Sequence, residues 1–567
     1  MKPIRKTAPE PLEPVAFQTP PAHRVTLDNG LRVVIVADER LPLVSYRLAF
    51  LSGDAAEPSD RIGVTSAMAS QITEGTENYS SLELAEKIER IGGTLRASSS
   101  DDFSMVVASA LSIYGTEVLD LMAEIVFVPT FPEKELDLYR RNMVENLKFQ
   151  RSQPNFLANE QIARLLFEGH PYATISPSTA DVEKLTREDL EAARKRTFLP
   201  NNAVLTIVGD VREEEILDKV RERFGNWGQG DVPSNVLPDI AEKDSRELVI
   251  VDRPGSAQAN IVLANIGVRR NDPDYFPLIV MNQVLGAGAS SRVFMNLREE
   301  KGYTYGAYTR LDTRLLSGLF EATAEVRTAV TGDSLKEFFY ELNRIRDEDI
   351  LREELDDAKN FLTGVFPIRA ETQEGLTNLI VNQELYGLPE DYLQTYRDNV
   401  DAVTVEDVRR VANEHIKPDR MTLVIVGDAA EILRQTDGYA DSIRVFDTAG
   451  NENDPGIYAS DPSEEPADVA GTWTLSLEFM GQNVPVTLVL EQEGSLVSGT
   501  LTTMLGESGF ENGKVNGSKI SAASVTELQG QQVEFLITAT ADGNKMEGSI
   551  SSSMLPQTLA FSGERQS

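Results

Sequence analysis

Residues 203–210 read AVLTIVGD, and residues 421–428 read MTLVIVGD. Both are apolar, β-branched runs of the kind that form buried strands. They begin 218 positions apart, and the same separation relates other stretches: LTREDL (185–190) and VTVEDV (403–408), Gly169 and Gly387, Pro171 and Pro389, Pro200 and Pro418. Glu135-Leu136-Asp137 matches residues 354–356 at a separation of 219. A repeat this long predicts two homologous domains, residues 20–236 and 248–447, joined by a polar linker at 237–247.

Each repeat mixes strand and helix signals. The turn signal LDNG (27–30) precedes the strand candidate LRVVIVAD, and VSYRLAFLSG (44–53) reads as another strand. Ser80 with Glu83 forms a capping box, and Thr186 and Thr404 are equivalent N-cap candidates. Strands mixed with amphipathic helices predict an α+β fold, with helices layered on a sheet in each repeat.

The two ends of the chain differ from the repeats. Residues 1–20 are Pro-rich and predict a flexible leader, and the acidic, Pro-containing segment 448–468 predicts a second linker. In 469–567, apolar residues alternate with polar ones, as at Trp473, Leu475 and Leu477. Short alternating strands separated by turn signals predict an all-β domain of meander type, either a barrel or a sandwich.

Composition excludes several classes of function. The chain has 567 residues, a net charge of −36, no cysteine and three histidines. The charge argues against binding to nucleic acid or to anionic membranes, and no apolar run is long enough for a membrane span. Thiolate zinc sites and a cysteine nucleophile are excluded. The leader and the Gly-, Ser- and Thr-rich C-terminal domain favour the bacterial periplasm or cell envelope, with the cytoplasm left open.

One helix candidate, GVTSAMASQITEGT (63–76), has an unusual pattern. Val64, Met68 and Ile72 form an apolar stripe, while Ser66, Ala69 and Ser70 recur at i, i+3 and i+4. Helices present metal ligands at that second spacing, yet none of these three side chains is a good ligand. On these residues alone, small side chains that permit close packing are the favoured interpretation.

The doubled α+β unit resembles the pitrilysin/insulinase family of zinc peptidases, above all its mitochondrial-processing-peptidase-like members. The stretches that carry the resemblance are GVTSAMASQITEGT, GGTLRASSSDDFSMV (92–106), EGHPYATI (168–175) and LGAGASSRVFMNLREEKGYTYGAY (285–308). The family motif G-x-x-H-x-x-E-H-x-x-x-x-G-T implies zinc-binding histidines at Ser66 and Ser70 and the general base at Ala69. The third ligand of the family, a glutamate, falls at Asn146, next to Glu145. The resemblance thus implies a degenerate zinc site and no zinc cofactor in this chain.

The resemblance also assigns residues that contact substrate. The family carries an arginine and a tyrosine seven residues apart in its second repeat, and Arg298 and Tyr305 match that spacing. In the family they hydrogen-bond the substrate backbone and the developing oxyanion. The alternative is an Arg298 paired with a neighbouring acid and a Tyr305 in the core. Ser99, Ser100, Asp101, Asp102 and Phe103 match the strand beside the family's substrate path.

These implications predict a non-catalytic subunit of a two-subunit zinc peptidase. A zinc-bearing homologous subunit would complete a heterodimer, and this chain would supply Arg298 and Tyr305 in trans for peptide hydrolysis, with no peptidase activity by itself. The alternative is a silent homodimer that acts as a binding or scaffold protein. The partner, the peptide and the ligand of the β-domain are not identified by the sequence.

Overall fold

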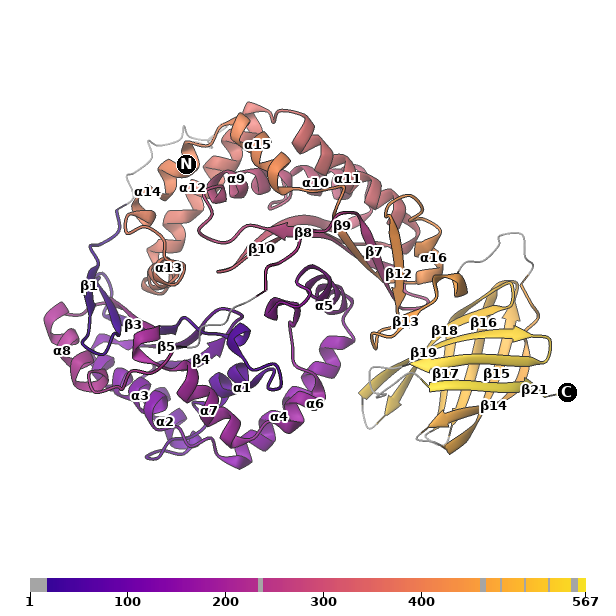
Figure 1. Cartoon of the computed structure of the whole chain (residues 1–567), viewed down its shortest axis with the longest axis horizontal. Coiled ribbons are helices and arrows are strands. Elements are labelled where there is room, and N and C mark those ends of the chain that lie inside the picture. Colours follow the sequence, from indigo (N-terminus) through magenta and orange to yellow (C-terminus); the bar gives the residue numbers. More distant parts are fainter. Residues whose placement is uncertain are drawn as a thin grey trace, which may run out of the picture.

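The computed structural model describes residues 18–232, 238–458, 466–479, 482–503, 506–528, 531–551 and 559–566. Two sheets, each layered with helices, face each other, and a β-barrel lies beside the second one (Figure 1). The fold class predicted from the sequence is confirmed. Residues 1–17 of the predicted leader lie outside the described residues.

The first sheet has the strand order β1-β2-β6-β3-β5-β4. Its strands are β1 (His23–Thr26), β2 (Arg32–Ala37), β3 (Leu43–Phe50), β4 (Thr94–Ser99), β5 (Ser104–Leu111) and β6 (Ala203–Gly209). The stretch AVLTIVGD forms β6, which is buried along its whole length and runs parallel to β2 and antiparallel to β3. The strand β4 is one edge of this sheet.

The second sheet has the order β13-β12-β7-β11-β8-β10-β9. Its strands are β7 (Glu247–Asp252), β8 (Gln258–Gly267), β9 (Thr304–Thr313), β10 (Gly318–Arg327), β11 (Thr422–Gly427), β12 (Ser442–Phe446) and β13 (Glu452–Asn453). The stretch MTLVIVGD forms β11, which is parallel to β7 and antiparallel to β8. The series β7-β11-β8-β10-β9 therefore repeats β2-β6-β3-β5-β4, as the internal repeat predicts.

Helices follow the same repeat. The first half carries α1 (Val64–Gln71), α2 (Ser81–Arg90), α3 (Gly115–Phe127), α4 (Glu133–Arg151), α5 (Pro154–Leu166), α6 (Thr179–Lys184), α7 (Arg187–Thr197) and α8 (Glu213–Phe224). The second carries α9 (Tyr275–Leu285), α10 (Arg292–Phe294), α11 (Thr331–Asp347), α12 (Arg352–Glu371), α13 (Gln373–Leu385), α14 (Tyr392–Asp401), α15 (Val405–His415) and α16 (Ala429–Leu433). Capping boxes at Ser80, Thr186 and Thr404 start α2, α7 and α15, and these three predictions are confirmed.

Two equivalent helices are exchanged between the halves. Helix α5 belongs to the first half but packs on β8 and β11 of the second sheet, whereas α13 packs on β3 and β6 of the first (Figure 1). Leu157 and Ile162 of α5 share a core with Val424, and Ile380 of α13 shares one with Val204. Each sheet thus has one face covered by its own half and the other by the opposite half. Burial of both faces explains why β6 and β11 are apolar throughout.

The C-terminal region is a closed barrel with the order β14 to β21, which decides between the predicted barrel and sandwich. Its strands are β14 (Gly471–Phe479), β15 (Gln482–Glu493), β16 (Leu496–Thr503), β17 (Gly506–Asn516), β18 (Lys519–Leu528), β19 (Gln531–Asp542), β20 (Lys545–Ser551) and β21 (Leu559–Arg565). Trp473 is fully buried in the barrel core, and its indole N–H donates to the Val469 carbonyl at 2.9 Å.

The segments predicted as linkers are partly ordered. Residues 238–246 contain no helix or strand, while Leu237 lies outside the described residues. In 448–458, β13 pairs with β12 and so extends the second sheet, because an Asp447 side chain that accepts from the Asn451 amide turns the chain back. Residues 459–465 of the predicted acidic linker lie outside the described residues. No described helix has the length and apolarity that a bilayer crossing requires.

Candidate functional site

Helix α1 carries the degenerate metal pattern and is anchored at its N-terminus by a glutamate. Gly63 adopts a φ of 83°, a conformation that favours glycine, and lets the chain enter the helix. The Glu57 carboxylate accepts from the amides of Gly63, at 2.7 Å, and of Thr65. Burial raises the pKa of Glu57 to about 7, although these amides act in the opposite direction. The apolar stripe Val64, Met68 and Ile72 lies in the core of the first half, as predicted.

Two of the predicted zinc-site positions are engaged inside the protein. The Ser66 hydroxyl donates to Asp54 at 2.8 Å, and the Ser99 hydroxyl donates to the other oxygen of the same carboxylate at 2.7 Å. Burial raises the pKa of Asp54, whereas the two hydroxyl donors lower it. Ala69, at the position of the general base, is 1% exposed and offers only a methyl group. Neither position can activate a water molecule.

The other two positions face a common cavity. Ser70 at the end of α1 and Asn146 on α4 both line a cavity of about 430 Å³ between these helices. The structure therefore brings together two residues that lie 76 positions apart in sequence. A hydroxyl and a carboxamide do not fit zinc, which binds imidazole, thiolate or carboxylate groups. Glu145 does not replace Asn146, because its carboxylate pairs with Lys148 at 2.9 Å.

Within the described residues, one group of possible metal ligands lies elsewhere, at the ends of α9 and α15. It consists of Asp274, Glu414 and His415. Asp274 already accepts two hydrogen bonds from Arg410, at 2.8 and 3.1 Å, and His415 Nε2 lies 2.8 Å from Asp274. Arg410 also pairs with Glu414 at 2.8 Å. A guanidinium that neutralises both carboxylates accounts for this cluster as an ion-pair network, so it is not assigned as a metal centre.

Arg298 and Tyr305 lie on neighbouring elements of the second half. Arg298 belongs to a π-helical turn (Met295–Glu300) that follows α10, and Tyr305 lies on the edge strand β9. π-Helical turns are rare and are frequent at functional sites. Tyr305 is 90% exposed, which excludes the core role considered above. The Arg298 guanidinium lies 4.9 Å from the Phe294 ring centroid and 3.4 Å from Glu299, so the predicted alternative of an acidic neighbour is present in the structure.

Residues 99–103, the predicted substrate contacts, comprise the last residue of the edge strand β4 and the turn that follows it, and they bond within the chain. Ser99 donates to Asp54, and Ser100 donates to the Phe103 carbonyl at 3.1 Å. Asp101 pairs with Arg314 at 2.6 Å, and Asp102 accepts from the Leu315 amide and the Tyr172 hydroxyl. Phe103 is buried, with its ring 5.2 Å from that of Tyr386. Peptide contact by these residues stays a prediction.

Arg314, which the sequence analysis did not single out, joins the two halves. It lies between β9 and β10 and pairs with Asp101 of the first half and with Asp312, at 2.8 Å. Its guanidinium also lies 4.8 Å from the Tyr172 ring centroid. Burial raises the pKa of Asp101 to about 6, and the charge of Arg314 opposes that shift. No local motif marks Arg314, because its partner lies 213 residues away in sequence.

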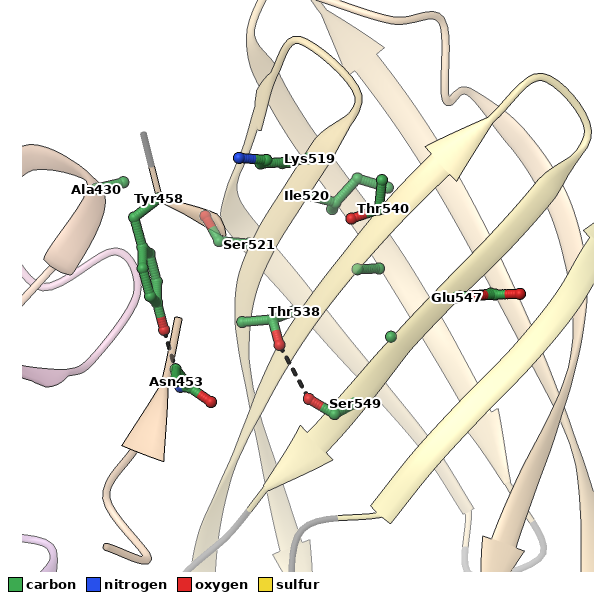
Figure 2. Close-up of a pocket in the computed structure, with 12 residues that line it drawn as sticks. Ala430, Asn453, Tyr458, Lys519, Ile520, Ser521, Thr538, Thr540, Glu547 and Ser549 are labelled. Atoms are coloured by element: carbon green, nitrogen blue, oxygen red, sulfur yellow. Dashed lines mark hydrogen bonds between the residues drawn. The ribbon is translucent and has the colours of Figure 1, made fainter. Parts of the chain in front are cut away.

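A smaller cavity of about 220 Å³ lies where the barrel meets the second half. Figure 2 shows Tyr458 and Asn453 facing the barrel strands that carry Thr538 and Ser549. The Asn453 amide donates to the Tyr458 hydroxyl, and the Thr538 and Ser549 hydroxyls bond each other, both at 3.0 Å. Since these groups satisfy one another, the cavity is a gap in the docking surface of the barrel.

The predicted zinc positions lie on a peptidase-type fold, but their side chains do not fit zinc. Residues 32–176 match the family model "Insulinase (Peptidase family M16)", and residues 184–362 match "Peptidase M16 inactive domain". The chain belongs to the M16 insulinase/pitrilysin family. The barrel at 471–565 lies beyond both matches.

Relatives agree with the family and differ in the activity that their names state. "Non-peptidase homolog YmxG" of Helicobacter pylori is 24% identical, over 70% of this chain and 93% of the relative. A plant relative, "Probable mitochondrial-processing peptidase subunit beta" of Arabidopsis thaliana, is 24% identical, over 73% of this chain and 80% of the relative. The crystal structure of a peptidase M16 inactive domain from Pseudomonas fluorescens superposes with a TM-score of 0.68 at 25% identity, covering 72% of this chain and 98% of that one.

Proposed function

We propose that this chain is the non-catalytic subunit of a two-subunit zinc peptidase. It pairs with a zinc-bearing homologue and supplies Arg298 and Tyr305 to the peptide that the partner cleaves. The zinc and the general base come from the partner. Peptide hydrolysis is thus a property of the pair and not of this chain.

The exposure of the Tyr305 phenol carries this proposal. A tyrosine that is 90% exposed on an edge strand contributes almost nothing to the core. Its phenol O–H and the five N–H donors of Arg298 are suited to stabilise a peptide carbonyl as it becomes an oxyanion. The π-helical turn supports the same assignment, since it presents Arg298 at the surface beside β9.

Two further observations support a partner. The positions for zinc and the general base hold Ser66, Ala69, Ser70 and Asn146, so hydrolysis requires a second site. One relative is named as the beta subunit of a processing peptidase, which is consistent with work in an assembly. We propose the bacterial periplasm or cell envelope as the compartment, on the grounds of composition, and subcellular fractionation tests it.

Reconstitution tests the function. The full chain is mixed with a homologue from the same genome that retains H-x-x-E-H, and cleavage of a quenched fluorescent peptide library is followed. We expect no cleavage by this chain alone and cleavage by the mixture. Arg298→Ala and Tyr305→Phe should each lower kcat of the mixture at least about tenfold, because one preorganised donor to an oxyanion is worth that much or more.

Matched controls separate these donors from general surface effects. Tyr340→Phe changes a tyrosine that is 54% exposed on α11, and Arg352→Ala changes an arginine whose side chain is 80% exposed on α12. Both controls should leave kcat unchanged. Equal losses in the controls, or full activity in Tyr305→Phe and Arg298→Ala, would contradict the role of the pair. A stable homodimer that never joins the zinc-bearing homologue would replace the proposal with the scaffold function.

A further inference from the structure

The π-helical turn that carries Arg298 has a regular counterpart in the first half. Helix α10 and this turn come directly before β9, just as α2 comes directly before β4. The counterpart α2 keeps α-helical geometry over all ten of its residues. Since π-helical turns are rare, contacts from outside the turn are needed to explain why the second half has one here.

Glu337 of α11 contacts both ends of the turn. Its Oε2 accepts from the Asn296 side-chain amide at 3.0 Å, and its Oε1 lies 3.4 Å from the Lys301 ammonium. Lys301 directly follows the turn, and its backbone amide donates to the Asn296 carbonyl at 3.0 Å, which is the i to i+5 bond of a π-helix. One carboxylate and one backbone hydrogen bond therefore join the same two residues.

The spacing of Asn296 and Lys301 requires the wide turn. At 3.6 residues per turn, two side chains five residues apart in an α-helix point about 140° apart around the helix axis, so one carboxylate cannot contact both. In a π-helix the i to i+5 bond places these two residues on the same side. The contacts of Glu337 therefore favour π-helical over α-helical geometry in this turn.

A second acid of α11 orients the Asn296 side chain. Glu341 is 2% exposed, and its Oε1 accepts from the same side-chain amide at 2.9 Å. The Asn296 side-chain oxygen is buried without a partner among the described residues, so the bonds to Glu337 and Glu341 determine how this side chain lies. Arg344 donates to the other oxygen of Glu341 at 3.5 Å, which compensates part of its buried charge.

We propose that Glu337 is a positioning residue for Arg298. It keeps Asn296 and Lys301 on one side of the turn, and Arg298, which lies between them in sequence, stays half-exposed with its guanidinium 4.9 Å from the Phe294 ring centroid. An α-helical turn over the same residues would rotate Arg298 to another direction around the helix axis. This inference rests on the proposed function, since Glu337 acts on the reaction only through Arg298.

Hydrogen exchange of the full chain, followed by mass spectrometry, tests the turn without a partner. Glu337→Gln leaves one acceptor oxygen in place of two at nearly the same side-chain volume. We expect segment 295–303 to exchange at least about threefold faster in this variant, because loss of a hydrogen bond to a charged group changes a local opening equilibrium by that factor or more. Lys301→Met should have the same effect. Glu86→Gln and Lys336→Met, matched changes at exposed positions on α2 and α11, should have none.

Kinetics of the reconstituted pair test the link to Arg298. Glu337→Gln should lower kcat at least about fivefold and leave KM within about twofold, because a misplaced donor weakens binding of the transition state more than binding of the peptide. The decisive comparison uses the Arg298→Ala background, in which Glu337→Gln should cause no further loss of kcat. Once the Arg298 side chain is removed, a residue that acts only through it has nothing left to position.

Unchanged exchange of segment 295–303 in both Glu337→Gln and Lys301→Met would overturn the proposal. An equal loss of kcat from Glu337→Gln with and without Arg298 would also overturn it, since that result indicates general damage to the fold. Lys301 is 36% exposed, so Lys301→Met gives the same two tests if Glu337→Gln does not fold. An inactive wild-type mixture would refute the subunit function, and faster exchange in the variants would still confirm that Glu337 maintains the turn.

Discussion

Replacement of Arg314 by methionine should loosen the contact between the two halves. Arg314 is 17% exposed and pairs with Asp101 of the first half at 2.6 Å and with Asp312 at 2.8 Å. Methionine keeps the apolar stem of the side chain but removes the guanidinium. The two carboxylates would then face each other without compensation, with Asp102 and Asp54 nearby.

The contacts set the size of the effect. Loss of one partner from a buried ion pair costs about 3–5 kcal/mol, and the lower end applies because Asp101 is 35% exposed. The unfolding entropy is about 2.1 cal/mol/K per residue, which for roughly 430 residues gives about 0.9 kcal/mol/K. A loss of about 3 kcal/mol should therefore lower Tm by about 3 °C. Arg352→Met, a matched change at an 80% exposed arginine, should shift Tm by less than about 0.5 °C.

The dependence of the Tm loss on pH shows whether the lost ion pair causes it. Burial raises the pKa of Asp101 to about 6, and removal of the Arg314 charge, which lowers this pKa, should raise it further. At about pH 5 the carboxyl is then protonated in the folded variant, so the missing guanidinium matters less than at about pH 8. The loss of Tm in Arg314→Met should accordingly be larger at the higher pH. The double variant Arg314→Met/Asp101→Asn should recover at least about half of the loss there.

Differential scanning fluorimetry of the four proteins at both pH values measures these shifts. A loss of Tm that is the same at both, with no recovery in the double variant, would refute the electrostatic account. Such a result would attribute the effect to the stacking of the Arg314 guanidinium on the Tyr172 ring, whose centroid is 4.8 Å away.

Two other perturbations follow from the structure. Burial raises the pKa of Glu57 from 4.5 to about 7. Between these pH values the folded chain binds a proton at this carboxyl that the unfolded chain does not bind. The free energy of unfolding should therefore rise as pH falls from 7 toward 4.5. Glu57→Gln should flatten the dependence of Tm on pH across that window, whereas an unchanged slope, or the same flattening in Glu86→Gln, would contradict this. Lys514 of the barrel pairs with Glu431 at 2.8 Å and with the nearly buried Asp428 at 3.3 Å, so Lys514→Met should free the barrel and increase the radius of gyration in small-angle scattering. Lys545→Met, a matched change at an exposed lysine of the barrel, should leave the radius of gyration unchanged. An unchanged radius for Lys514→Met would show that other contacts keep the barrel against the second half.

Local features of the fold could be predicted because their causes are local. A capping box such as Thr186 with Asp189 needs a side chain and an amide three residues apart, and neighbouring residues determine whether it forms. The apolar runs at 203–210 and 421–428 identify buried strands for the same reason, and their constant separation reveals the repeat. The degenerate zinc site could also be predicted from the sequence, because the chemistry of a metal ligand depends on residue type.

The tertiary structure alone decided which surfaces meet. Nothing in the residues of helices α5 and α13 states that each covers the sheet of the opposite half. The pairing of Arg314 with Asp101 and the contacts of Glu337 with Asn296 and Lys301 depend in the same way on long-range packing. Such contacts arise when the chain closes on itself to bury both faces of each sheet, which is a property of the whole molecule and not of any segment.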